Sequence, residues 1–114
     1  GGHASEFLGA WRYGSKGAEY VISMTEDVEL DFDGPYKEAI RVVGVLRPSS
    51  RWLQAQLTAK GAPDVRVGAI RLRFVREGDA VSVVSNYMPA SKTEWQKDLT
   101  ARRPTAAESG ALAL

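Results

Sequence analysis

The sequence contains no cysteine and a single histidine, His3. A chain without cysteine forms no disulfide framework, and it offers neither a thiolate metal site nor a cysteine nucleophile. One histidine is too few for a metal site that needs two, and its position near the start of the chain gives a Ser-His-Asp triad no suitable base. These absences remove several classes of catalytic chemistry. The sequence therefore predicts no catalytic residue, no metal site and no cofactor.

Long apolar runs and an excess of charge are also missing. No stretch approaches the roughly 18 consecutive apolar residues of a membrane-spanning helix. The 15 basic and 14 acidic residues leave a net charge of +1, which falls short of the basic footprint of nucleic-acid-binding domains. Several arginines do fall within residues 65–76, but they are expected on the outer face of a strand. Nucleic acid is therefore disfavoured as a partner, and the cellular compartment is left open.

The remaining composition is that of one ordinary globular domain. Hydrophobic residues make up 44% and charged residues 25% of the 114 residues. Residues 1–6 are small and polar and are expected to be a flexible N-terminal segment, which includes dipeptides that cloning commonly leaves behind. Residues 7–103 are predicted to form a single β-barrel domain, and residues 104–114 are predicted to be a C-terminal tail.

Apolar and polar residues alternate in short segments along most of the chain, which is the pattern of half-buried strands. It is clearest where Val28, Leu30 and Phe32 alternate with acidic residues, which are expected to face solvent rather than to hold a metal. Turns rich in glycine, proline and aspartate separate the segments. The predicted strands occupy residues 7–13, 19–24, 28–33, 39–47, 51–60, 65–76 and 80–88.

Residues 92–103 fit two patterns. Ser91 and Glu94 have the spacing of a helix capping box, and Trp95 and Leu99 lie four residues apart, which favours a helix. Alternate residues also fit a strand, which would close a barrel against the first strand. We favour the strand. The predicted fold is therefore all-β, an antiparallel up-and-down meander of seven to eight strands that forms a small closed barrel.

The positions predicted to face the barrel interior carry bulky side chains. They are Trp11, Tyr20, Ile22, Val28, Leu30, Phe32, Ile40, Leu46, Leu53, Leu57, Ile70, Leu72, Phe74, Val81 and Val83. Eight strands enclose an interior that side chains can just fill, or that holds one small ligand. Because the predicted side chains are large, the sequence favours a packed core over a roomy pocket.

If side chains fill the interior, a binding function must use the outer surface of the barrel. The outer face of residues 39–47 is half apolar, and Trp52 is predicted to point outward on the next strand. Aromatic residues and arginine are enriched at protein interfaces. The function predicted first is a non-enzymatic accessory domain that docks onto a protein partner or a larger assembly. The residues expected to make this contact are Trp52, Val43, Val45, Arg71 and Arg73.

The motif Gly9-Ala10-Trp11 resembles the Gly-x-Trp start of the calycin-type barrels, the lipocalins and avidins. In those families the tryptophan plugs one end of the barrel, and in lipocalins it packs under an arginine from near the last strand. The resemblance implies that Arg102 or Arg103 takes that position here. Ser85-Asn86-Tyr87 is similar to the Thr-Asp-Tyr motif of lipocalins. The tryptophans of this chain lie elsewhere than those of the avidin ligand site, so the resemblance implies a barrel and no particular ligand.

This resemblance supplies an alternative function, a calycin-like carrier of one small apolar ligand in the barrel cavity. The residues then expected near the ligand are Trp11, Tyr20, Phe32 and Tyr87. A second alternative is a small barrel enzyme of the isomerase or cyclase type that acts through the shape of its cavity. A cavity larger than roughly 300 Å³ would favour the carrier or the enzyme, whereas a filled interior with an apolar patch outside would favour docking.

Overall fold

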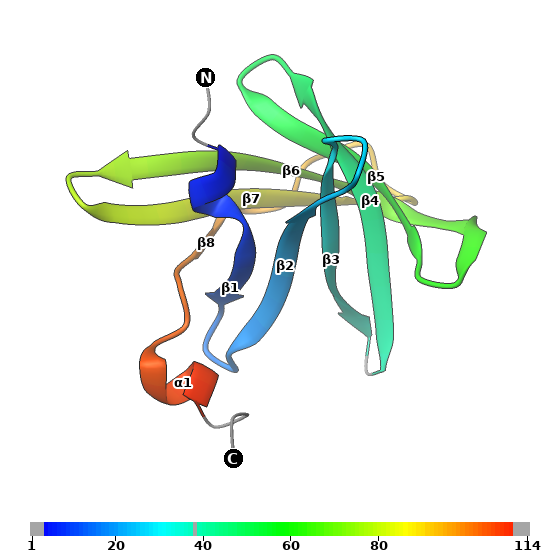
Figure 1. The fold of residues 1–114 in the computed structure, drawn as a ribbon. Coiled ribbons are helices and arrows are strands. Elements are labelled where there is room, and N and C mark those ends of the chain that lie inside the picture. Colours follow the sequence, from blue (N-terminus) through cyan, green and yellow to red (C-terminus); the bar gives the residue numbers. More distant parts are fainter. Residues whose placement is uncertain (1–3, 38, 111–114) are drawn as a thin grey trace.

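The computed structural model describes residues 4–37 and 39–110, in which eight antiparallel strands form one sheet in sequence order (Figure 1). The strands are β1 (Gly9–Tyr13), β2 (Ala18–Met24), β3 (Leu30–Lys37), β4 (Ile40–Ser49), β5 (Trp52–Ala59), β6 (Ala62–Glu77), β7 (Ala80–Pro89) and β8 (Leu99–Ala101). A 3-10 helix, η1 (Ala4–Phe7), precedes the sheet, and a short helix, α1 (Ala106–Gly110), follows it. The all-β meander predicted from the alternation is confirmed.

The sheet curls until its first and last strands meet. Arg12 of β1 and Arg102, which follows β8, exchange two backbone hydrogen bonds of 2.7 and 2.9 Å. Among the described residues, this isolated bridge is the only β-pairing between the two ends of the sheet. The result is the predicted small barrel, nearly closed and with one unsealed seam.

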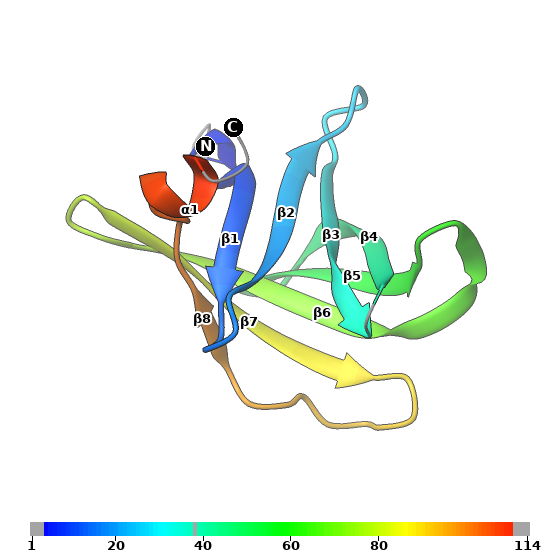
Figure 2. The same cartoon turned by 90° about the horizontal axis from the view of Figure 1, so that it is seen from below.

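The segment between β7 and β8 forms neither the full-length strand that we favoured nor the alternative helix. Only Leu99–Ala101 pairs with β7, while residues 91–98 double back along β7 as irregular chain (Figure 2). Hydrogen bonds from Asn86 hold this chain in place, because its side-chain amide donates to the Gln96 carbonyl and to the Asp98 carboxylate. The preference for a strand is therefore confirmed only at the end of the segment.

Aromatic packing closes one end of the barrel. The Phe7 ring stacks on Phe74 with the centroids 4.0 Å apart. It also lies 6.1 Å from the ring of Trp11, whose indole N–H donates to the Phe7 carbonyl at 2.9 Å. Trp11 is fully buried, and the guanidinium of Arg103 covers its ring at 4.1 Å. Phe7, the last residue of η1, thus belongs to the core.

The two ends of the chain lie partly outside the described residues. These are residues 1–3 of the expected flexible segment and residues 111–114 of the expected tail. The described part of the tail includes α1, whose Glu108 carboxylate contacts Arg12 and Arg102. No helix among the described residues is long and apolar enough to cross a membrane.

Most residues predicted to face inward are buried or partly buried, but Val28 and Ile40 are exposed by 72% and 48%. Val28 adopts a positive φ of 62° in the turn between β2 and β3, where its amide donates to the Thr25 carbonyl. Ile40 is the first residue of β4, beside an irregularity in the pairing with β3. Both predictions are wrong because turn geometry, rather than the alternation, decides where the inward positions begin.

Candidate functional site

The end of the barrel away from Phe7 and Trp11 contains a cavity of about 350 Å³. All four tyrosines of the chain line it, together with one phenylalanine: Tyr13, Tyr20, Tyr36, Tyr87 and Phe32. Buried aliphatic side chains complete the wall, namely Val42, Leu57 and Ile70. The expectation of a filled interior does not hold at this end of the barrel.

Tyr20 lies at the centre of the aromatic wall. Its ring centroid is 5.5 Å from that of Tyr13 on β1 and 5.1 Å from that of Phe32 on β3. The ring planes are inclined to that of Tyr20 by 39° and 38°. Tilted aromatic pairs at such distances attract one another, so this part of the wall is formed before any ligand arrives.

Glycines on β3 and β6 leave room for two aromatic rings of the cavity wall. A Cβ atom on Gly34 would lie 2.8 Å from the Phe32 ring, and one on Gly68 would lie 2.9 Å from the Tyr87 ring. A larger residue at Gly34 would push the Phe32 ring aside, and one at Gly68 would clash with the Met88 backbone carbonyl as well as with the Tyr87 ring. The rings of Phe32 and Tyr87 therefore pack directly over two positions that have no side chain.

The hydroxyl of Tyr20 has no hydrogen-bond partner among the described residues, although the residue is only 2% exposed. Burial raises the pKa of Tyr20 well above its ordinary value, so the group stays protonated and is a hydrogen-bond donor. Two other hydroxyls of the wall are already engaged, since Tyr87 donates to the Val67 carbonyl at 3.0 Å and Ser85 to the Leu99 carbonyl at 3.5 Å. The Tyr20 hydroxyl is thus a buried donor without a partner in the described part of the chain, and almost none of its surface is accessible.

The mouth of the cavity is formed partly by the irregular segment between β7 and β8. Gln96 and Lys97 of this segment line the cavity, and Lys97 brings a positive charge to its edge. The Gln96 amide donates to the Tyr87 carbonyl at 2.8 Å, which ties the segment to the cavity wall. Next to them, Tyr36 is 39% exposed and contributes the outermost aromatic ring.

Arg71 fastens the same segment to the outside of the barrel. Its guanidinium lies 4.4 Å from the ring centroid of Trp95 and 4.3 Å from that of Trp52 on β5. Its Nε donates to the Asn86 side-chain carbonyl at 2.8 Å. Stacking of arginine on tryptophan is favourable, so these contacts hold residues 91–98 against the sheet and fix the edge of the mouth.

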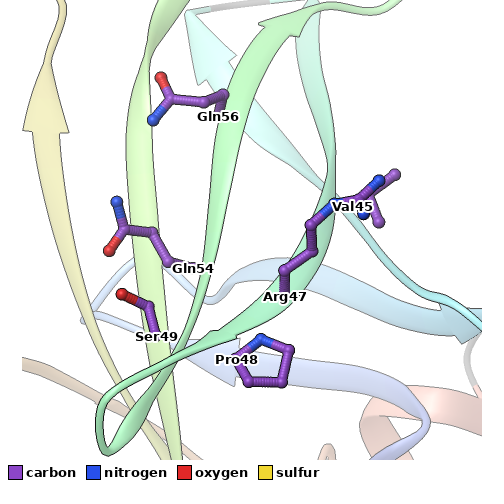
Figure 3. Close-up of a pocket in the computed structure, with 6 residues that line it drawn as sticks. All are labelled: Val45, Arg47, Pro48, Ser49, Gln54 and Gln56. Carbon is purple, nitrogen blue, oxygen red and sulfur yellow. The ribbon is translucent and has the colours of Figure 1, made fainter.

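The residues predicted to bind a partner are only partly gathered by the fold. Trp52 contacts Arg71 and also Arg73, whose guanidinium lies 4.9 Å from its ring centroid. Val43 and Val45 are half-buried on β4. Val45 borders a surface groove of about 390 Å³ that is otherwise lined by Arg47, Pro48, Ser49, Gln54 and Gln56 (Figure 3). This surface groove is mostly polar and is lined by residues of β4 and β5.

The residues expected near a ligand are brought together with one exception. Tyr20, Phe32 and Tyr87 all line the cavity, whereas Trp11 lies in the closed end with Phe7. Trp11 is therefore part of the floor of the barrel and not of the cavity wall.

Sequence reasoning missed two of the lining tyrosines. Tyr13 lies two residues after Trp11 on the same strand, so the period-two alternation already pointed it inward. Tyr36 lies near the end of β3, beyond the predicted strand and beside a register irregularity, and no local pattern places it at the mouth.

Comparisons with protein-family models, with curated proteins and with solved structures find no match to this chain. The geometry of the cavity is therefore the main support for a function.

Proposed function

We propose that the chain binds one small, mainly apolar molecule in the barrel cavity. The observation that carries this proposal is the cavity of about 350 Å³, lined by every tyrosine of the chain and by buried aliphatic side chains. Ligand pockets in proteins are mostly apolar, contain a few polar groups and begin at about 300 Å³. An apolar cavity of about 150 Å³ already holds benzene, so this one suits a molecule of about two to three rings.

The closed end of the barrel supports the same proposal. Arg103 covers Trp11 and donates to the backbone carbonyls of Ala10 at 3.1 Å and Glu6 at 2.6 Å. This is the arrangement of arginine over tryptophan that the resemblance of Gly9-Ala10-Trp11 to calycin-type barrels implies. A barrel that is plugged at one end and hollow at the other suits a carrier, and we propose a calycin-like architecture for it.

Titration with the fluorescent probe N-phenyl-1-naphthylamine tests this function. Ser85→Leu places a larger side chain in the cavity and is expected to weaken probe binding by about tenfold or more. Ser82→Leu makes the same change on the outer face of β7 and is expected to leave binding unchanged. Thermal unfolding of both variants shows that they fold. A wild-type protein that binds no probe with one-to-one stoichiometry would contradict the proposal.

Native mass spectrometry of the protein from its own source then asks what the cavity holds. An added small mass that is lost on denaturation supports a carrier. The same cavity would also serve an enzyme that acts through its shape, which we propose as a further alternative. Recovery of the bound compound unchanged after incubation favours the carrier, whereas its conversion to a product favours the enzyme.

A second proposal is the docking of a protein partner on the outer face of β4 and β5. The half-buried Val43 and Val45 and the groove beside Val45 support it. It ranks below the cavity because its strongest anchors, Trp52 and Arg71, already contact each other. Groups that are engaged within the chain have less to offer a partner.

Crosslinking in an extract of the source organism tests docking. A protein that crosslinks to the wild type and is lost with Val45→Asp would support it. Val21→Asp is the matched control, because Val21 is an exposed valine on the outer face of a different strand, β2. Equal loss with both variants would indicate an effect of charge and would contradict docking at Val45.

A further inference from the structure

The cavity wall carries a single charge, and this charge is positive. Lys97 lies at the mouth, where it is exposed, and within residues 4–37 and 39–110 it is the one charged residue that lines the cavity. The lining residues in this part of the chain include no acid, and none of its ion pairs involves Lys97. The Lys97 ammonium group is therefore open to an anionic partner from outside the chain.

Hydrogen bonds on both sides of Lys97 hold its backbone at the mouth. The Gln96 amide donates to the Tyr87 carbonyl at 2.8 Å, and the Asn86 side-chain amide donates to the Gln96 carbonyl at 3.3 Å. The same Asn86 amide donates to the Asp98 carboxylate. Because the backbone is already placed, pairing with a ligand restricts only the lysine side chain, which lowers the entropic cost of binding.

Two arginines add positive charge near the aromatic wall of the cavity. Burial raises the pKa of Tyr13, and the charge of Arg41 opposes this rise. Burial and the neighbouring Tyr36 raise the pKa of Tyr87, and the charge of Arg66 opposes this second rise. Each arginine is thus close enough to a lining tyrosine to act on its hydroxyl. This end of the barrel has cations besides Lys97.

The acid beside Arg41 does not cancel this positive charge. Asp33 contacts the Nε atom of Arg41 at 2.6 Å and the Nζ atom of Lys60 at 2.7 Å. Because two cations share one carboxylate, the three side chains together remain positive. Arg66 donates to the Gln56 side-chain carbonyl, and no ion pair in the described part of the chain includes it. An anion that approaches these groups is therefore attracted.

The interior of the cavity determines where the charge of a ligand can lie. The deep part of the wall is apolar and buried, and it includes Phe32, Val42, Leu57 and Ile70. An anionic group among these side chains would lose its water without gaining a cation, which is costly. At the mouth, the same group keeps much of its water and lies within reach of Lys97. The apolar part of a ligand therefore enters first, and a charged group stays at the mouth.

We propose that the cavity selects amphipathic anions, which are apolar molecules with one negatively charged group at one end. The apolar part lies among the buried side chains, and the charged group lies at the mouth beside the ammonium group of Lys97. This inference rests on the proposed function, because it names the ligand class of the same cavity. Lys97 is then the residue that makes an anion bind more tightly than a neutral compound of the same shape.

A pair of probes with nearly the same shape tests the role of Lys97. The carboxylate of 1-naphthylacetate is replaced by a neutral amide in 1-naphthylacetamide. Isothermal titration calorimetry measures the affinity ratio of acid to amide for the wild type and for Lys97→Gln. We expect the wild type to bind the acid more tightly, and we expect the ratio to fall by about threefold in the variant, as for the loss of one exposed ion pair. Added salt should lower the ratio more in the wild type than in the variant.

The control variant is Lys92→Gln, which removes the same charge from an exposed residue of the same segment that does not line the cavity. At about 0.1 M salt, charges more than about 10 Å apart are largely screened, so this variant is expected to keep the affinity ratio of the wild type. Lys97→Arg retains the positive charge and is also expected to keep the ratio. Thermal unfolding checks that all three variants fold.

The outcomes separate this inference from the proposed function. An unchanged ratio in Lys97→Gln, or an equal fall in Lys92→Gln, would overturn the inference while leaving a ligand-binding cavity. Tighter binding of the amide than of the acid by the wild type would do the same. If the neutral N-phenyl-1-naphthylamine binds and 1-naphthylacetate does not, the ligand class is wrong. If none of these three compounds binds, the proposed function itself fails.

Discussion

The guanidinium of Arg103 lies 4.1 Å from the centre of the Trp11 ring, so a residue that follows the last strand covers a residue of the first. The same guanidinium donates to the carbonyls of Ala10 and Glu6, which ties η1 and β1 together. The strands themselves are joined at this seam by the bridge between Arg12 and Arg102. The contacts of the Arg103 side chain therefore hold the two ends of the barrel together alongside the single backbone bridge.

Replacing Arg103 by alanine tests this closure. The variant loses the stacking on Trp11 and two hydrogen bonds, and we expect it to lower the free energy of unfolding by about 2 kcal/mol. Urea denaturation measures the change. Arg102→Ala is the control, because Arg102 is exposed and pairs with Glu108 of α1. An exposed ion pair contributes little, so Arg102→Ala is expected to lose less stability than Arg103→Ala. Equal losses in the two variants would contradict the role of Arg103.

Replacing Gly34 by alanine tests whether the position of the Phe32 ring shapes the cavity. The added methyl group would lie 2.8 Å from the Phe32 ring, so the ring must move. We expect a loss of about 1–3 kcal/mol in stability and a clear fall in affinity for N-phenyl-1-naphthylamine. Gly78→Ala is the control, because Gly78 has a φ of 61° in the turn between β6 and β7 and does not line the cavity. It is expected to cost about 1 kcal/mol without changing probe binding.

Replacing Trp95 by alanine tests whether its contact with Arg71 holds residues 91–98 at the mouth of the cavity. Without the contact to Arg71, the segment 91–98 loses an anchor, and the Gln96 amide should exchange its hydrogen faster. The dissociation of a bound probe should become faster for the same reason. Hydrogen-exchange mass spectrometry and stopped-flow fluorescence measure the two effects. Trp52→Ala removes the other aromatic contact of Arg71 and is expected to leave the exchange at Gln96 nearly unchanged.

Acidification is expected to loosen α1 through Glu108. Hydrogen bonds from Arg102 and from the Thr105 backbone lower the pKa of Glu108 from 4.5 to about 2. Because the pKa is lower in the folded state than in the unfolded state, this contribution to stability is present above pH 4.5 and is lost as the pH falls through about 2. The amide signals of α1 in an NMR titration report the change. Glu108→Gln should remove this pH dependence, and an unaltered titration in the variant would contradict the assignment.

The strand pattern was predictable from the sequence because period-two alternation is a local property of the chain. It located the strands now seen as β1 to β7, and it placed Tyr20, Phe32 and Leu72 on inner faces where all three are buried. Val28 shows the limit of the method. A turn with a positive φ interrupts the alternation, and the residues alone do not say which one takes that conformation.

The candidate site was predictable only in part. Tyr20, Phe32 and Tyr87 were named for the cavity from their inward positions and a resemblance, and they do line it. The empty volume itself was missed. Its wall includes rings that lie over Gly34 and Gly68, and which ring lies over each glycine is settled only after the strands have paired.

The sequence by itself determined an all-β meander with alternating inner and outer faces, since each strand is specified by residues close together in the chain. Only the tertiary structure decided that Arg103 rather than Arg102 covers Trp11, that Arg71 contacts Trp95, and that the Tyr20 hydroxyl finds no partner among the described residues. These relationships join residues from different strands. They depend on register and on the curvature that closes the barrel, and neither of these is encoded in a local pattern.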